Sequence, residues 1–159
     1  MKFSKMFVFA IIGLCVIGGI AGLVLHVVSS QNPPLKTAAL TIGDTTYHVE
    51  VADTSLSRAR GLSYRSGLGA DSAMLFIFPR AGMEGFWMKD MSFSLDMVWI
   101  HGGKIVGLTP DVPPQPNTSL TKLPLYYPPE PADWVLELNA GDIAKHDFKI
   151  GDEVKLQVN

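Results

Sequence analysis

Cysteine is nearly absent from this chain, because Cys15 is the only one among its 159 residues. Residues 16–159 therefore contain no disulfide, no thiolate metal site and no cysteine nucleophile. That part of the chain must be stabilised by the packing of side chains and not by covalent cross-links.

Charged residues are missing from residues 6–28, MFVFAIIGLCVIGGIAGLVLHVV, which include no Asp, Glu, Lys or Arg. A helix of that length, at about 1.5 Å per residue, spans a hydrocarbon core of about 30 Å, so we expect a transmembrane signal anchor. Lys2 and Lys5 precede it without any acidic residue. This predicts a single-pass protein of the cell membrane, with residues 1–5 as a cytoplasmic tail and the C-terminal domain outside the cytoplasm. The alternative is cleavage near Ser30, which would leave a secreted or periplasmic domain.

An excess of basic residues is also missing. Without Lys2 and Lys5, the 13 Lys and Arg residues fall to 11, against 15 Asp and Glu, and no basic run remains. This balance argues against nucleic acid as a partner, because binding to a phosphate backbone requires a positive surface. Neither H-x-H, H-E-x-x-H nor G-x-S-x-G occurs, so we expect no metal site, no cofactor and no serine nucleophile.

Alternating apolar and polar residues predict a mainly β domain over residues 38–159, preceded by a proline-containing linker at residues 29–37. Gly43-Asp44 predicts a hairpin turn, and one short helix is expected to begin at Asp53 or Thr54 and end at Gly61, with Leu56 on its packed side. Strands are expected at residues 38–42, 45–52, 73–78, 86–89, 93–101, 104–109, 133–139 and 152–158. This pattern is typical of a compact, mostly antiparallel β sandwich or barrel.

Proline is concentrated in one stretch, since eight of the eleven prolines lie between Pro110 and Pro131. Proline lacks an N–H and restricts φ, so this stretch is expected to be a long surface loop and not a central strand. Tyr126 and Tyr127 offer contact area there, and we interpret the loop either as a stiff connection or as a binding loop.

Six segments occur in a fixed order: VEVADTSLSRARGLSYR, AMLFIF, FWMKDMSFSLDMVWI, GGKIVGL, DWVLELNAGD and IGDEVKL. Together they resemble the DUF192 family, also called UPF0127, over nearly all of residues 45–158. The resemblance implies an exported, compact β sandwich of jelly-roll type, and it implies no particular biochemical activity. The chain departs from the usual family pattern at Ser63, Ala73 and Asp90, where the family commonly has Met, Gly and Asn.

The segment FWMKD, residues 86–90, is the strongest indication of a site. If it is extended, Phe86 and Met88 face the core while Trp87 and Lys89 share the opposite face, where a flat aromatic surface would lie beside a cation. Asp96 falls on the same strand face as apolar residues, which predicts burial with a partner such as Lys89 or Arg65.

The leading hypothesis is a membrane-tethered binding module for a cell-envelope glycan or protein segment. Its ligand-binding candidates are Trp87, Lys89, Asp90, Asp96, Arg65, Tyr126 and Tyr127. The first alternative is a hydrolase acting on envelope polysaccharide, with Asp96 or Glu137 as acid or base and Lys89 stabilising negative charge. The second alternative is an interaction subunit of a membrane complex, and a purely structural role for Trp87 and Lys89 also stays open.

Overall fold

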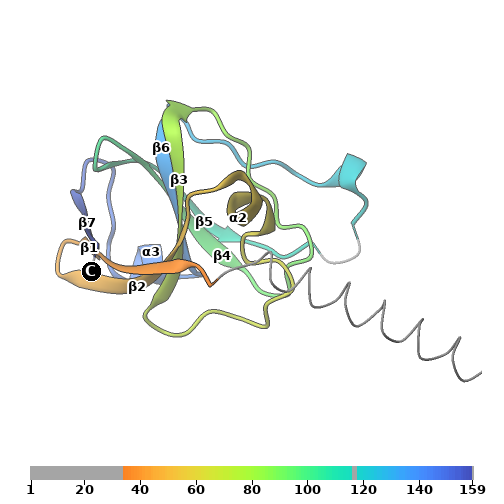
Figure 1. Ribbon diagram of the computed structural model, residues 1–159, viewed down its shortest axis with the longest axis horizontal. Coiled ribbons are helices and arrows are strands. Elements are labelled where there is room, and N and C mark those ends of the chain that lie inside the picture. Colours follow the sequence, from red (N-terminus) through yellow and green to blue (C-terminus); the bar gives the residue numbers. More distant parts are fainter. Residues whose placement is uncertain (1–33, 116–117, 159) are drawn as a thin grey trace, which may run out of the picture. The chain divides into compact units, whose positions relative to one another are not determined.

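The computed structural model describes residues 34–115 and 118–158 (Figure 1). Among these residues no helix is long and apolar enough to cross a membrane, and the predicted anchor at residues 6–28 lies outside them. The described elements are, in order, β1 (Lys36–Ile42), β2 (Thr45–Ala52), α2 (Ser55–Arg60), β3 (Ser72–Gly82), β4 (Leu95–His101), β5 (Lys104–Val112), η1 (Leu120–Lys122), β6 (Ala132–Asn139), α3 (Asp142–Lys145) and β7 (Val154–Val158).

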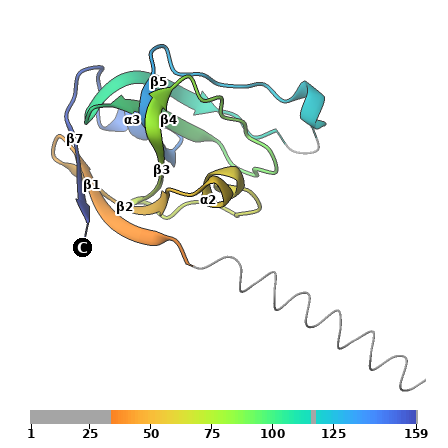
Figure 2. The ribbon, with the colours of Figure 1, turned by 45° about the horizontal axis from the view of Figure 1, so that its top comes forward.

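The strands form one curled sheet in the order β5-β4-β6-β3-β2-β1-β7 (Figure 2). Its two outer strands approach each other at one end, where Ile105 N–H donates to the Asp152 carbonyl at 3.0 Å and Val154 N–H donates to the Gly103 carbonyl at 2.8 Å. The prediction of a mainly β domain is confirmed. The architecture is one seven-stranded half-barrel and not two stacked sheets.

Sheet pairing departs from the expected antiparallel pattern at one place, because β2 and β3 run parallel, with Val49 opposite Ala73. A parallel pair requires a crossover connection, and residues 53–71, which contain α2, supply it. Thr54 caps α2 as predicted, in a capping box with Ser57, and Gly61 ends the helix at φ 49°. Leu56 is 59% exposed, so the prediction that it packs against the domain is wrong.

Three adjacent strands, β4, β6 and β3, are buried on both faces. In β4, Val98 and Ile100 belong to an inner core enclosed by the curled sheet, whereas Met97 and Trp99 belong to an outer core. The outer core is covered by loop residues, including Leu62, Met88 and Met91. Two-sided burial explains why these strands are mostly apolar, as in AMLFIF at residues 73–78.

Asp96 on β4 is fully buried, and its hydrogen bonds connect β4 to β5 and α3. Its Oδ1 accepts a hydrogen bond from the Asp111 backbone N–H of β5 at 2.9 Å, and its Oδ2 accepts one from the Ile143 N–H of α3 at 2.8 Å. The side chain therefore occupies the N-terminal turn of α3, a helix that the sequence did not predict. The expectation that Asp96 pairs with Lys89 or Arg65 is wrong.

Three strand predictions also need correction. Residues 86–89 form isolated bridges, Phe86 to Tyr126 and Lys89 to Gln115, and not a regular strand. β3 continues past Pro79 to Gly82, with a shift of register against β6 that accommodates the missing N–H. β5 includes Pro110, which is tolerated because β5 lies at the edge of the sheet.

We predict that Asp96→Asn lowers the free energy of unfolding by about 2 to 3 kcal/mol, because one backbone N–H would then face an amide donor in the buried interior. Asp44→Asn in the exposed hairpin turn is the matched control and should change it by less than about 0.5 kcal/mol. Urea denaturation of the full chain in a polyoxyethylene detergent measures both. Equal losses in the two variants would contradict the role assigned to Asp96.

Candidate functional site

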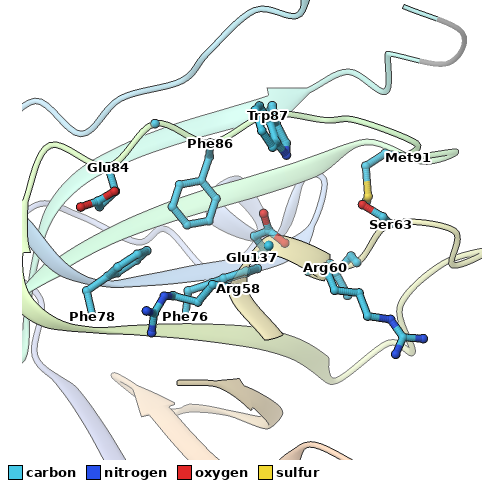
Figure 3. Close-up of a pocket in the computed structure, with 14 residues that line it drawn as sticks. Arg58, Arg60, Ser63, Phe76, Phe78, Glu84, Phe86, Trp87, Met91 and Glu137 are labelled. Atoms are coloured by element: carbon cyan, nitrogen blue, oxygen red, sulfur yellow. The ribbon is translucent and has the colours of Figure 1, made fainter. Parts of the chain in front are cut away.

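A pocket of about 160 Å³ lies over the outer face of the sheet, between α2 and the segment that follows β3 (Figure 3). One molecule of liquid water occupies about 30 Å³, so the pocket has room for a small ring or one side chain. Its lining residues come from α2 and the following turn, from β3, from the segment before β4, and from β6: Arg58, Ala59, Arg60, Gly61, Leu62, Ser63, Phe76, Phe78, Glu84, Gly85, Phe86, Trp87, Met91 and Glu137.

Aromatic rings form one wall of the pocket. Phe86 meets Phe76 edge to face, with ring centroids 5.0 Å apart, and meets Trp99 in the same way at 5.5 Å. Such contacts stabilise the arrangement beyond the apolar area that they bury. Trp87 follows in sequence but is 47% exposed, so its ring lies at the rim of the pocket. The prediction that Phe86 and Met88 face the core is confirmed, since Phe86 packs against the outer core and Met88 is fully buried.

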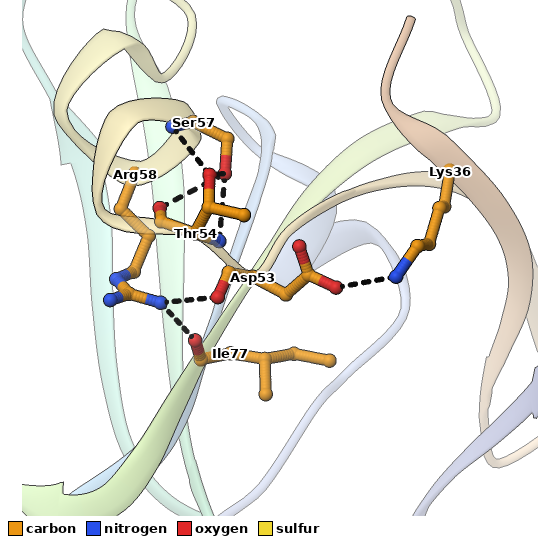
Figure 4. A network of polar contacts seen from close by, with 6 residues as sticks. All are labelled: Lys36, Asp53, Thr54, Ser57, Arg58 and Ile77. Atoms are coloured by element: carbon orange, nitrogen blue, oxygen red, sulfur yellow. Dashed lines mark hydrogen bonds and ion pairs between the residues drawn. The ribbon is translucent and has the colours of Figure 1, made fainter. Parts of the chain in front are cut away.

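The opposite wall is α2, which Arg58 holds against β3 (Figure 4). One guanidinium nitrogen of Arg58 donates to the Asp53 and Ile77 carbonyls, both at 2.8 Å. The guanidinium also lies 5.0 Å from the centroid of the Phe78 ring. The charge of Arg58 is therefore engaged by backbone oxygens and an aromatic face.

A cluster of hydrogen bonds joins the two walls. Ser63 Oγ donates to the Lys89 carbonyl at 3.0 Å, and Tyr64 N–H donates to the Asp90 carbonyl at 3.0 Å. The Tyr64 hydroxyl donates to Asp90 Oδ2 at 2.6 Å, and Lys89 forms an ion pair with the same carboxylate. Hydrogen bonds from Lys89 and Tyr64 hold the pKa of Asp90 below its usual value. Both Tyr64 and Asp90 adopt positive φ, a strained conformation that this network of contacts maintains.

Glu137 forms the floor of the pocket. It lies in β6 opposite Met74 of β3 and Met97 of β4, and it is only 5% exposed. Burial raises the pKa of Glu137 to about 8, and no hydrogen bond or cation from residues 34–115 and 118–158 opposes this rise. Figure 3 shows its carboxylate in the middle of the lining side chains. A nearly buried acid that faces a pocket without a protein partner is an unusual feature.

Of the candidate catalytic and ligand-binding residues, Trp87 and Glu137 line this pocket. Lys89 and Asp90 belong to the cluster that joins the walls and do not line the pocket. Arg65 forms a bidentate pair with Glu50, with 2.8 Å between its Nη2 and Oε2, and this pairing lowers the pKa of Glu50. The contributions of Phe76, Phe78 and Ser63 depend on packing between distant segments and were not predicted.

The two carboxylates proposed for a hydrolase lie on opposite faces of the sheet. Glu137 is opposite Met97 of β4, and both side chains face the outer core. Asp96 precedes Met97 in β4, so its side chain faces the inner core. A retaining glycosidase requires two carboxyl groups about 5 to 5.5 Å apart on the same cleft. The version of the hydrolase hypothesis that uses Asp96 and Glu137 as a pair is therefore wrong.

The proline-rich loop contacts the aromatic wall through its two tyrosines. Phe86 and Tyr126 exchange two backbone hydrogen bonds, of 2.9 and 2.8 Å. A Cβ atom on Gly85 would lie 2.9 Å from Cε1 of Tyr127, so a larger residue at 85 would displace that ring. The loop is thus attached next to the pocket, and Tyr127 remains largely exposed there.

Comparisons with known proteins show the family through a family model and the fold through solved structures. The DUF192 family model, described as "Uncharacterized ACR", matches residues 38–156. A solved Sinorhizobium meliloti protein described as a "putative transcription regulator" is 26% identical, with a TM-score of 0.70 over 79% of this chain and 97% of that one. A Novosphingobium aromaticivorans protein of unknown function is 24% identical, with a TM-score of 0.68 over 78% and 93%. Among curated proteins, none matches the chain.

The pKa of Glu137 predicts a specific dependence of stability on pH. Its folded value is about 8 against an ordinary 4.5, so the folded state holds this proton more tightly. The resulting stability is fully present below pH 4.5 and is lost as the pH rises through 8. Between pH 5 and pH 9 we expect the wild type to lose about 4 kcal/mol more than Glu137→Gln in urea denaturation. Parallel pH profiles for the two proteins would contradict the assigned burial.

Proposed function

Since the chain belongs to the DUF192 family, whose description assigns no activity, we propose a function from the pocket: a binding module that receives one side chain of a protein segment. The observation that carries this proposal is Glu137, a nearly buried carboxyl without a partner among the described residues, at the floor of an aromatic-walled pocket. Concave sites with apolar walls and few polar groups are typical of ligand binding.

The surroundings of the pocket favour a protein segment over a glycan. Phe86 and Tyr126 are paired, so the segment that contains Trp87 runs beside the segment that contains Leu125 and Tyr127. Trp87 lines the pocket, and the Tyr127 ring lies against Gly85, another lining residue. Trp87, Leu125 and Tyr127 are all about half exposed. A bound peptide can cover such apolar side chains with its own, in addition to inserting one side chain. A sugar would leave part of this apolar surface in water, and it is kept as an alternative outcome of the test.

We further propose that the module is tethered to the outer face of a cell membrane by residues 6–28. The support for this is the absence of charge over those 23 residues and the two lysines that precede them. The excess of acidic over basic residues in the remainder gives no support to a role on nucleic acid. The envelope is therefore where a partner is to be sought.

Binding at the pocket is tested with the full chain in a polyoxyethylene detergent, labelled with ¹⁵N at its three tryptophans. Amino-acid amides and monosaccharides are titrated as separate sets. We expect the Trp87 indole resonance to shift when amino-acid amides are added. The resonance of Trp134, which packs on the inner core, should not shift. Trp87→Ala should weaken binding yet cost less than about 1 kcal/mol of stability, in contrast to about 3 kcal/mol for Phe86→Ala.

Other results of this titration separate the alternatives. A shift of Trp87 with monosaccharides alone would replace the peptide by a glycan as the ligand. No shift with either set would remove the basis of the proposed function.

The tether is tested by fractionation of cells that express the chain. The full chain should remain in the membrane pellet after alkaline extraction, and deletion of residues 6–28 should move it to the soluble fraction. N-terminal sequencing of the mature protein distinguishes an intact anchor from cleavage near Ser30. Recovery of the full chain in the soluble fraction with its N-terminus intact would contradict the anchor.

A further inference from the structure

We propose that the group received by the pocket is an alkylammonium cation, which forms an ion pair with the Glu137 carboxylate while its methylene or methyl groups contact Phe86 and Trp87. This inference rests on the proposed binding function and names the chemical class of its ligand. A lysine side chain of a protein segment and a free amine share this chemistry.

The charges that line the pocket favour a cation at its floor. Besides Glu137, they are Arg58, Arg60 and Glu84. Arg58 is engaged by two backbone carbonyls and by the Phe78 ring, and it does not neutralise Glu137. Arg60 and Glu84 are exposed, where water screens them. The charge at the floor is therefore negative whenever Glu137 is ionised, and no described residue supplies its counter-ion.

Aromatic rings make the same pocket favourable for a cation. The faces of tryptophan and phenylalanine attract ammonium and guanidinium groups, more strongly when water is excluded. The domain already contains one such contact at this place, between Arg58 and Phe78. Phe86 and Trp87 belong to the same lining and have no described cation against their rings. A neutral ligand would use the aromatic wall but would leave the ionised form of Glu137 without a partner.

Binding of a permanent cation must displace the Glu137 proton, since the pair forms only with the carboxylate. With a pKa of about 8, roughly nine in ten molecules carry that proton at pH 7. A cation should then release about 0.9 proton per molecule bound at pH 7. Its affinity should increase about tenfold between pH 6 and pH 7 and become constant above pH 9.

The experiment is isothermal titration calorimetry on the full chain in a polyoxyethylene detergent. The probes are choline, its neutral carbon isostere 3,3-dimethylbutan-1-ol, and N-acetyl-lysine methylamide. Each is titrated in two buffers of different ionisation enthalpy, which measures the protons released. We expect both cations to bind at least tenfold more tightly than the isostere at pH 8. The ratio of lysine amide to choline distinguishes a primary from a quaternary ammonium source.

Two variants assign the effect to one carboxyl group. Glu137→Gln should lose the pH dependence and at least tenfold in affinity for the cations, with little change for the isostere. Glu130→Gln removes the same charge from an exposed position outside the pocket lining and should behave as the wild type. The proton release of the wild-type chain provides a readout that does not depend on the stability of either variant.

Failure of this inference can be told from failure of the proposed function. If the isostere binds as tightly as the cations and no proton is released, the ligand is neutral and the pocket is still a binding site. If neither cation binds, the inference is overturned, and the Trp87 titration with other amides decides whether the pocket binds anything.

Discussion

The burial of three adjacent strands on both faces is the constraint on which the rest of this structure depends. β4, β6 and β3 pack their inner side chains within the curled sheet, and their outer side chains would face water if nothing covered them. The short crossover helix α2 and the segment before β4 provide that cover, and the proline-rich loop pairs with the latter. The pocket lies where this cover is incomplete, between α2 and the aromatic segment. Its location thus follows from how the outer core is closed.

Two buried carboxyl groups, one on each face of the sheet, show how different such groups can be. Asp96 accepts hydrogen bonds from two backbone amides and thereby connects β4 to β5 and α3. Those donors satisfy the carboxylate, so its burial contributes to the fold. Glu137 faces the outer core without a described donor and holds its proton instead. In the sequence both residues are single acids within mostly apolar strands. Only the hydrogen-bond donors that the fold places around Asp96 distinguish this structural residue from Glu137, the candidate site residue.

The sequence predicted the features that depend on neighbouring residues. The hairpin at Gly43-Asp44, the start of α2 at Thr54 and the inward direction of Phe86 and Met88 follow from turn chemistry, capping and strand alternation. It did not predict the parallel pairing of β2 with β3, because such pairing joins segments with no local pattern in common. α3 was missed because it is four residues long and depends on a distant side chain, Asp96, at its first turn. The walls of the pocket were not predicted either, because they too are formed by segments that are distant in the sequence.

A glutamate at position 137 is not the residue that selection for stability alone would favour. An apolar residue between Met74 and Met97 would extend the outer core without any cost of desolvating a carboxyl group. The departure from that simpler solution occurs beside an aromatic wall, and a strained cluster at Tyr64 and Asp90 keeps the two sides of the pocket together. Places where a sequence breaks local rules and retains strain are expected to be functional sites. The buried Glu137 and the positive φ of Tyr64 and Asp90 are three such departures near one pocket. Glu137 is therefore the residue from which the function of this domain is best sought.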